Sequence, residues 1–213
     1  MKNKPIILVA GEPKSIFFEI FFKAIKNKRY KSPLILICCK KILLQHIRKC
    51  KFKKTLKLID INKIKNININ NDSINLINIE LKKQTNKKFQ LEITRRYIDE
   101  TFNVAFKLIK SGLTNKFING PINKKNFLNK KFTGVTEYIS ENFKKKKIGM
   151  LIYNENLSVC PLTTHLPIKL VPKKITQKLI EEKIEIINSF FIKNLEIKPK
   201  IAVTGLNPHC ETI

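Results

Sequence analysis

Residues 6–26, with the sequence IILVAGEPKSIFFEIFFKAIK, decide the fold. The run 6–10 is apolar and β-branched, which is typical of a strand buried on both faces. Gly11-Glu12-Pro13 ends this strand. The periodicity that follows predicts a helix over residues 15–26, with Ile16, Ile20 and Ala24 on one face. A buried strand that turns at a glycine into a helix is the repeating unit of α/β folds.

The same alternation continues along the chain. Strands are predicted at residues 34–39, 56–61 and 117–118, and helices at residues 40–49 and 91–111. Residues 62–78 are rich in Asn, Ile and Lys. We interpret them as low-complexity drift rather than as irregular strands. The alternation predicts a parallel, doubly wound sheet in a first α/β domain over residues 1–121.

A second, smaller α/β domain is predicted over residues 122–213. Within it, residues 132–137 resemble a turn that opens a helix, with Thr133 or Thr136 as the cap. Two short strands, 149–153 and 157–162, are expected to pair as a hairpin. A helix is predicted over residues 175–191, with a strand at 201–203 after it.

The composition gives a formal net charge of +27, which first suggests a nucleic-acid or membrane partner. Only four of the 43 basic residues are Arg, and the Lys residues are spread along the whole chain together with Ile and Asn. Nucleic-acid-binding proteins instead concentrate basic residues on one face. We therefore predict no specific nucleic-acid partner and attribute the charge to compositional drift.

The cysteines and the amino-terminal residues bear on the compartment. Five cysteines, without a C-x-x-C pair, do not form a disulfide framework and favour a reducing cytoplasm. The apolar run that ends at Ala10 is too short for a signal peptide or a membrane span. A cytoplasmic protein without a membrane partner is predicted.

Two short motifs carry the candidate chemistry: Thr163-Thr164-His165-Leu166-Pro167 and Gly205-Leu206-Asn207-Pro208-His209. Each follows a predicted strand, and residues beyond the carboxyl ends of strands line the ligand crevice of an open α/β sheet. Two imidazoles placed there could share one divalent metal ion. The alternative is that each histidine only forms a local hydrogen bond in a turn. The third histidine, His46, is interpreted as structural or as a surface residue.

Five segments in this order resemble one family, the 4-hydroxythreonine-4-phosphate dehydrogenases of vitamin B6 synthesis. They are the two histidine motifs, Gly11-Glu12-Pro13, Asn119-Gly120-Pro121-Ile122-Asn123-Lys124 and Phe132-Thr133-Gly134-Val135-Thr136-Glu137. The resemblance implies a two-domain α/β/α sandwich like that of isocitrate and isopropylmalate dehydrogenases. It also implies a homodimer with its sites at the subunit interface.

The resemblance implies an enzyme as well. Family members oxidise 4-phosphooxy-L-threonine, a small phosphorylated amino acid, with NAD, and the 3-oxo acid then loses carbon dioxide to give 3-amino-2-oxopropyl phosphate. By motif match, His165 and His209 would be two of three metal ligands, for zinc, magnesium or cobalt. Thr136 matches a substrate-binding position. Lys124 is expected at the surface, and Glu12 is expected to be structural.

Three departures from the family pattern are expected to matter. Val135 stands where the family has a histidine. Ser15, Phe17 and Phe18 stand where Gly, Gly and Pro are expected, so that bulky rings would crowd the first turn. The sequence ends before the family's third histidine and much of its nicotinamide site, so the second domain is expected to be incomplete. The alternative function is therefore an inactive remnant, or a metal- or anion-binding fragment of the enzyme.

Overall fold

The computed structural model describes residues 3–27, 30–82, 87–128, 132, 134–145 and 147–206. The chain separates into two compact units, unit 1 (Met1–Lys131) and unit 2 (Phe132–Ile213). The short helix α4 (Lys124–Phe127) belongs to unit 1, where it contacts the long helix α3. The predicted domain boundary after Pro121 stays a prediction.

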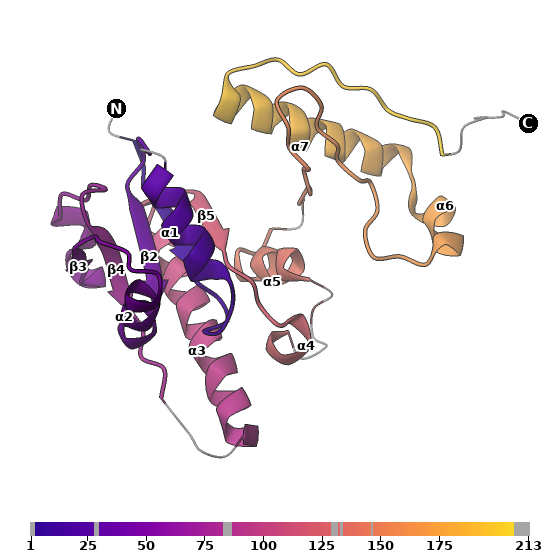
Figure 1. Ribbon diagram of the computed structural model, residues 1–213. Coiled ribbons are helices and arrows are strands. Elements are labelled where there is room, and N and C mark those ends of the chain that lie inside the picture. The colour runs from indigo at the N-terminus through magenta and orange to yellow at the C-terminus, as the bar shows by residue number, and fades with distance from the viewer. Residues whose placement is uncertain are drawn as a thin grey trace, which may run out of the picture. The chain divides into compact units, whose positions relative to one another are not determined.

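Unit 1 is built on a five-stranded sheet in the order β3-β4-β2-β1-β5 (Figure 1). The strands are β1 (Ile6–Val9), β2 (Leu34–Cys38), β3 (Leu56–Leu58), β4 (Ile74–Asn78) and β5 (Lys116–Asn119). All four pairings are parallel, as the alternation of strands and helices predicts. The carboxyl ends of all five strands therefore lie at one edge of the sheet.

Helices α1 (Phe17–Asn27) and α2 (Lys40–Lys49) cover one face of this sheet. Four phenylalanines of α1 and Leu43 of α2 pack into one buried cluster with alternate strand residues, among them Leu8, Leu36 and Leu76. His46 of α2 stacks on Phe18, with ring centroids 4.5 Å apart. This contact gives His46 the structural position expected for it.

Helix α3 (Lys87–Lys110) contacts β1 and β2. It contributes buried side chains to a second apolar layer, apart from the cluster that α1 and α2 form. Its buried residues include Tyr97, Phe102 and Phe106, and the other alternate strand residues, such as Val9 and Ile37, are also buried. The Tyr97 hydroxyl accepts a hydrogen bond from the backbone N–H of Cys39 at 2.9 Å. Helices on both faces explain why the strands of unit 1 are apolar without alternation.

The face of α1 that packs on the sheet is not the one that carries Ile16 and Ile20. Ile16 is 58% exposed and Ile20 is 55% exposed, whereas the phenylalanine pairs 17–18 and 21–22 are buried. The sequence offers two apolar stripes around this helix, and the aromatic stripe buries more surface per residue. The helix itself was predicted correctly, and the stripe of Ile16, Ile20 and Ala24 is not the one that packs on the sheet.

The prediction of low-complexity drift over residues 62–78 is also wrong. This stretch contains the 3-10 helix η1 (Ile61–Asn66) and the buried strand β4, which lies between β2 and β3. Asn75 can lie inside the sheet because its amide donates to the carbonyls of Leu34 at 2.9 Å and Asn70 at 2.6 Å. Asn71 likewise donates to two backbone carbonyls and accepts from the N–H of Leu34 at 2.8 Å.

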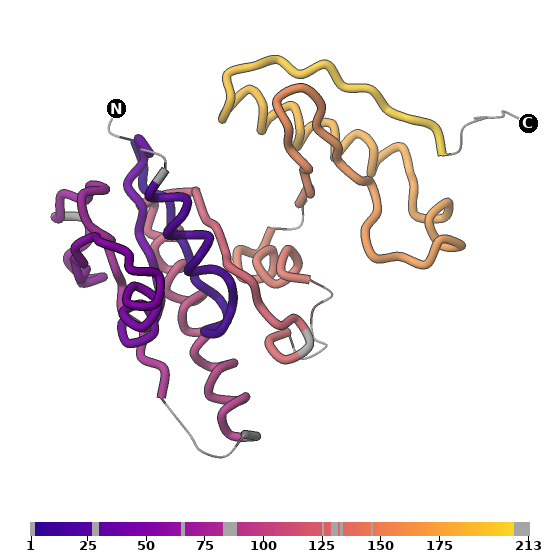
Figure 2. The backbone as a smooth tube through the Cα atoms, in the orientation of Figure 1, coloured from indigo at the N-terminus to yellow at the C-terminus, as the bar shows by residue number. Residues whose placement is uncertain are grey.

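Unit 2 is dominated by helix α7 (Gln177–Leu195), which Thr176 caps by accepting a hydrogen bond from the N–H of Leu179 at 3.2 Å. It also contains α5 (Val135–Asn142), η2 (Ile168–Leu170) and α6 (Val171–Lys174). After α7 the chain runs back beside the helix as an extended segment (Figure 2). None of the α7 residues is buried.

The expected strands of unit 2 are not formed as predicted. Between residues 149 and 162 a single antiparallel bridge joins Ile152 to Val159, through hydrogen bonds of 2.8 and 3.0 Å. Residues 201–203 are extended and have no strand partner among the described residues. An apolar run becomes a strand only where another strand satisfies its backbone groups.

No helix in the described ranges combines the length and apolar character that a membrane span requires.

Shortening a side chain on each stripe of α1 tests the observed orientation. Phe18→Ala should lower the free energy of unfolding by about 3–5 kcal/mol, because it leaves a cavity under a ring that is 1% exposed. Ile20→Ala should change it by no more than about 0.5 kcal/mol. Urea denaturation of both variants measures the difference, and a larger loss for Ile20→Ala would contradict the packing.

Candidate functional site

The loops after β1 and β5 meet at one point of unit 1. The chain leaves β1 toward β2 on one side, and β5 pairs with β1 on the other side, so the sheet has a topological switch point between β1 and β5. The N–H of Gly120 donates to the carbonyl of Val9 at 2.7 Å, and the N–H of Glu12 donates to the carbonyl of Pro121 at 2.8 Å. Two motifs more than a hundred residues apart in the sequence are therefore joined through their backbones.

Only glycine fits at the centre of this junction. Gly11 has a φ of +75°, and a Cβ atom there would lie 2.3 Å from the carbonyl oxygen of Pro121. A Cβ on Gly120 would lie 2.2 Å from the carbonyl oxygen of Ala10. These distances are too short for any side chain, so the loops after β1 and β5 require both glycines.

Phe17 fills the space beside the junction. Its ring lies 2.7 Å from the position that a Cβ of Gly120 would occupy, and it packs edge-on against Phe18 at 5.5 Å. Of the two rings expected to crowd the first turn, that of Phe17 lies against the glycine loop, whereas that of Phe18 stacks on His46. The packing is tight, but α1 accommodates it because both rings point into the core.

The polar residues of this junction hold the two loops together. A carboxylate oxygen of Glu12 accepts a hydrogen bond from the N–H of Asn123 at 3.3 Å, so Glu12 has the structural contact expected for it. Asn123 caps α4 by accepting from the N–H of Asn126 at 3.2 Å. Lys124 is exposed at the first position of α4, as expected.

In unit 2, His165 lies in an exposed turn with a φ of +54°. Neighbours of His165 in the sequence line a pocket of about 550 Å³. They are Thr163, Thr164 and Leu166, and residues at the start of α7 line the same pocket. The other lining residues include Lys174, Thr176, Lys178 and Glu182. Ammonium groups and hydroxyls around an open pocket suit an anionic group of a ligand.

Sequence reasoning did not find Lys174 and Lys178, because each is one lysine among many in this chain. The signal that could have found them is their spacing around Thr176, a cap residue at the start of the helix predicted over residues 175–191. The first backbone N–H groups of a helix have no intrahelical partner, and the amino-terminal end of a helix favours negative charge.

Thr136 is exposed in the first turn of α5, so its hydroxyl is accessible to a ligand. The cap of α5 is Gly134, and it forms no side-chain hydrogen bond. The prediction that Thr136 caps this helix is therefore wrong, and the other cap candidate, Thr133, lies outside the described residues. Val135 is half-buried at the start of the helix.

The described residues do not by themselves form a metal site. No three His, Cys, Asp or Glu side chains gather in the described ranges closely enough to hold an ion. Burial raises the pKa of the Cys38 thiol well above its usual range, with a smaller contribution from Cys39, so this thiol stays protonated. His209 lies outside the described residues, and its pairing with His165 stays a prediction.

The sequence profile of the family described as "Pyridoxal phosphate biosynthetic protein PdxA" matches residues 30–212 of this chain. The chain belongs to the PdxA family. The family resemblance of the five motifs is thereby confirmed. Curated relatives of the chain are named 4-hydroxythreonine-4-phosphate dehydrogenase.

Two curated relatives show how much of a PdxA-family protein this sequence spans. The chain is 30% identical over 214 residues to a 4-hydroxythreonine-4-phosphate dehydrogenase from Sulfurihydrogenibium sp., covering 96% of this chain and 63% of that protein. It is 29% identical to the corresponding protein of Vibrio cholerae, covering 98% of this chain and 64% of that protein. The chain thus spans slightly less than two thirds of these relatives.

Solved structures agree on the fold. A 4-hydroxythreonine-4-phosphate dehydrogenase from Klebsiella pneumoniae matches with a TM-score of 0.79 and one from Burkholderia phymatum with 0.77, each at 22% identity. Both matches cover 98% of this chain and 64% of the other. The predicted α/β fold class, with a second domain that covers only part of its counterpart, is confirmed.

A matched pair of glycine substitutions tests the junction between the two loops. Gly112 has a φ of +77°, close to that of Gly11, but nothing lies within 4 Å of its missing Cβ. Gly112→Ala should therefore show the backbone cost alone, about 1–2 kcal/mol. Gly11→Ala should lose about 1–3 kcal/mol more, because the methyl group also collides with Pro121. Equal losses in urea denaturation would show that the junction is not tightly packed.

Proposed function

We propose that this chain takes part in the NAD-dependent oxidation of 4-phosphooxy-L-threonine. The observation that carries the proposal is the family match over residues 30–212. In this reaction the carbon that bears the secondary hydroxyl transfers a hydride to NAD, and the hydroxyl loses its proton. The resulting 3-oxo acid then loses carbon dioxide, which leaves 3-amino-2-oxopropyl phosphate.

The residues of unit 2 receive distinct roles in this proposal. The exposed hydroxyl of Thr136 hydrogen-bonds a polar group of the substrate. The pocket at the start of α7 takes the phosphate group, because Lys174 and Lys178 supply positive charge and Thr163 and Thr164 supply hydroxyl groups. Glu182 lines the same pocket, and its carboxylate disfavours a second anionic group there.

His165 and His209 are proposed to contribute two neutral imidazoles to a divalent-metal site. Imidazole ligands suit zinc or cobalt better than magnesium. When bound, such an ion would polarise the substrate hydroxyl and the oxo group that replaces it. The exposed turn leaves the His165 ring accessible to such a ligand.

We also propose that two copies of the chain form a homodimer in the cytoplasm. Large apolar side chains of unit 2 are exposed, among them Leu157 at 75% and Ile168 at 88%. A second copy could cover these apolar side chains and remove them from water. The described cysteines are free, which agrees with a reducing compartment. Sedimentation equilibrium measures the oligomeric state.

The activity is tested by NADH formation from 4-phosphooxy-L-threonine and NAD in the presence of zinc or magnesium. Wild-type protein should turn over the substrate, and His165→Ala should abolish turnover. His46→Gln, which changes the third histidine of the chain, is the matched control and should remain active at temperatures where it stays folded.

Zinc binding provides a readout that does not need turnover. In equilibrium dialysis, His165→Ala and His209→Ala should each weaken zinc binding about tenfold or more, while His46→Gln should not. Binding of zinc or phosphate without any turnover would support the alternative function, a metal- or anion-binding fragment. Equal zinc binding by all variants would rule out the histidine pair as a metal site.

The phosphate pocket gives a separate prediction. The double substitution Lys174→Gln and Lys178→Gln should raise the KM for the substrate about tenfold with a smaller effect on kcat, because it removes ground-state attraction for the phosphate. Lys169→Gln with Lys173→Gln changes the net charge equally, and neither residue lines the pocket. An equal rise in KM for both pairs would reveal a general charge effect instead.

A further inference from the structure

A pocket of about 680 Å³ lies in unit 1, at the edge of the sheet opposite the glycine loops. Its lining residues come from the carboxyl-terminal half of α1 and from the segments that lead into β2, β3 and β4. Leu34 and Ile74 are the first residues of β2 and β4, so the pocket opens at the amino-terminal ends of the strands.

The floor of this pocket is apolar. Phe21, Leu36 and Ile74 are buried, while Ile25 and Leu34 are half-buried and face the cavity. A pocket of this size with an apolar floor is in the range that binds small organic molecules in proteins. Filling it would remove the half-buried apolar side chains from water.

Two lysines from different segments of the chain line the same pocket. Lys26 is exposed near the end of α1, and Lys54 is half-buried just before β3. The ion pairs found among the described residues do not include either ammonium group. The only acidic residue in the lining, Asp72, accepts a hydrogen bond from the Asn70 amide at 2.6 Å.

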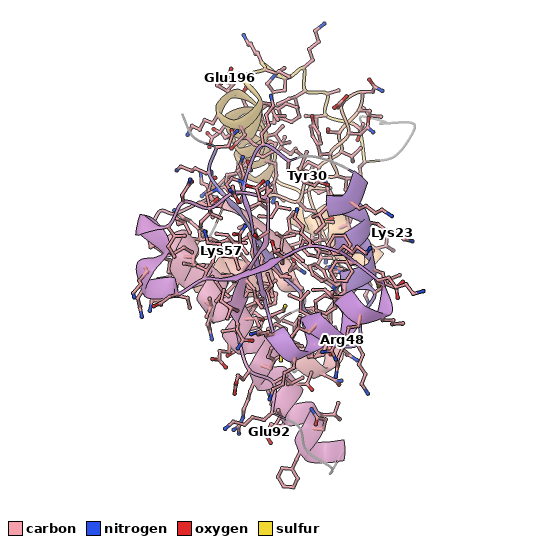
Figure 3. All side chains as sticks on the ribbon, turned by 60° about the vertical axis from the view of Figure 1, so that its left-hand side comes forward. Lys23, Tyr30, Arg48, Lys57, Glu92 and Glu196 are labelled. Carbon is pink, nitrogen blue, oxygen red and sulfur yellow. The ribbon has the colours of Figure 1, made fainter. Side chains whose placement is uncertain are left out.

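The wider surroundings of Lys54 strengthen the positive potential. The stretch from Lys40 to Ile59 contains no Asp or Glu, and Figure 3 labels two of its basic residues, Arg48 and Lys57. One acidic side chain of α1, that of Glu19, forms an ion pair with this stretch. Its carboxylate lies 3.7 Å from the Lys49 ammonium group. A concave surface with a net positive potential raises the local concentration of anions.

We propose that this pocket binds a small organic anion, a phosphate ester or carboxylate whose body is an aromatic ring or a branched apolar chain. The body lies on Phe21, Ile25 and Leu36, and the anionic group lies between Lys26 and Lys54. The hydroxyl group of Ser73, which lines the pocket and lies 2.9 Å from the Thr55 hydroxyl, is a further polar contact for the anion.

This site is separate from the junction of the glycine loops. The strands between the two edges have four or five residues, which corresponds to about 13–17 Å. The ligand is therefore not a substrate bound at the switch point. Its site also shares no residue with the phosphate pocket of unit 2, so the two proposals can fail independently.

Phenyl phosphate is the probe, because it combines an aromatic ring with a dianion. Titration of the full chain, followed by methyl NMR signals, should shift Ile25, Leu36 and Ile74 with a common Kd. The double substitution Lys26→Gln and Lys54→Gln should raise this Kd about tenfold, as expected for the loss of two ion pairs at partly exposed positions.

Lys23→Gln with Lys53→Gln is the matched control. Both residues are exposed, they lie on α1 and in the same loop as Lys54, and neither lines the pocket. Lys23 is labelled in Figure 3. This pair removes the same net charge and should leave the Kd unchanged within about twofold.

Two further probes separate the contributions of the ring and the anion. Inorganic phosphate and phenol should each bind at least tenfold more weakly than phenyl phosphate at these methyl groups, because each lacks half of the recognised chemistry. The proposal is overturned if inorganic phosphate binds as well as phenyl phosphate, or if both lysine pairs weaken binding equally. It is also overturned if the shifts are confined to Leu166 and Leu179 of the unit 2 pocket.

Discussion

The contact between the loops after β1 and β5 constrains unit 1 more than any other interaction. Gly11 and Gly120 let two backbones approach to a distance that excludes a Cβ atom. Through this contact the chain's first turn and the segment that leads to α4 become one structure. The order of the sheet depends on it, because β5 can pair with β1 only if the two loops clear each other.

The junction also explains why glycine persists at these positions in a chain that has so few glycines. Gly112 has a positive φ, but no atom lies near the position that its Cβ would occupy. Gly11 needs both its positive φ and the absence of a side chain. Phe17 shows the opposite tendency, since a large ring fills the space that smaller residues would leave beside Gly120. The backbone contact therefore admits only glycine at positions 11 and 120, whereas position 17 beside it accommodates a large ring.

Much of unit 1 could be predicted from the sequence because its strands and helices have strong local patterns. The helix of residues 40–49 and the strand at Leu34 were placed closely. The orientation of α1 could not be predicted, since two apolar stripes compete and only the sheet decides between them. Strand β4 was missed because Asn75 interrupts its apolar run, and one of the two carbonyls to which its amide group donates, that of Leu34, belongs to a strand far away in the sequence.

Unit 2 shows the reverse problem. Its apolar runs predicted strands, yet a single bridge forms, because strand formation requires a partner that local patterning cannot supply. The exposed turn around His165 was located correctly as a loop. Its relation to His209 could not be derived, and Lys174 and Lys178 were hidden by the abundance of lysine.

The order of the strands has a consequence for synthesis on the ribosome. Strand β1 pairs with β5, which joins Ile6 to Lys116. At typical translation speeds the segment between them takes roughly 5–20 s to make. During that time the edge of β1 that will receive β5 has unpaired backbone N–H and C=O groups, and the apolar side chains of β1 lack their full cover. A chaperone that shields emerging apolar segments would therefore act on this protein before its fifth strand leaves the exit tunnel.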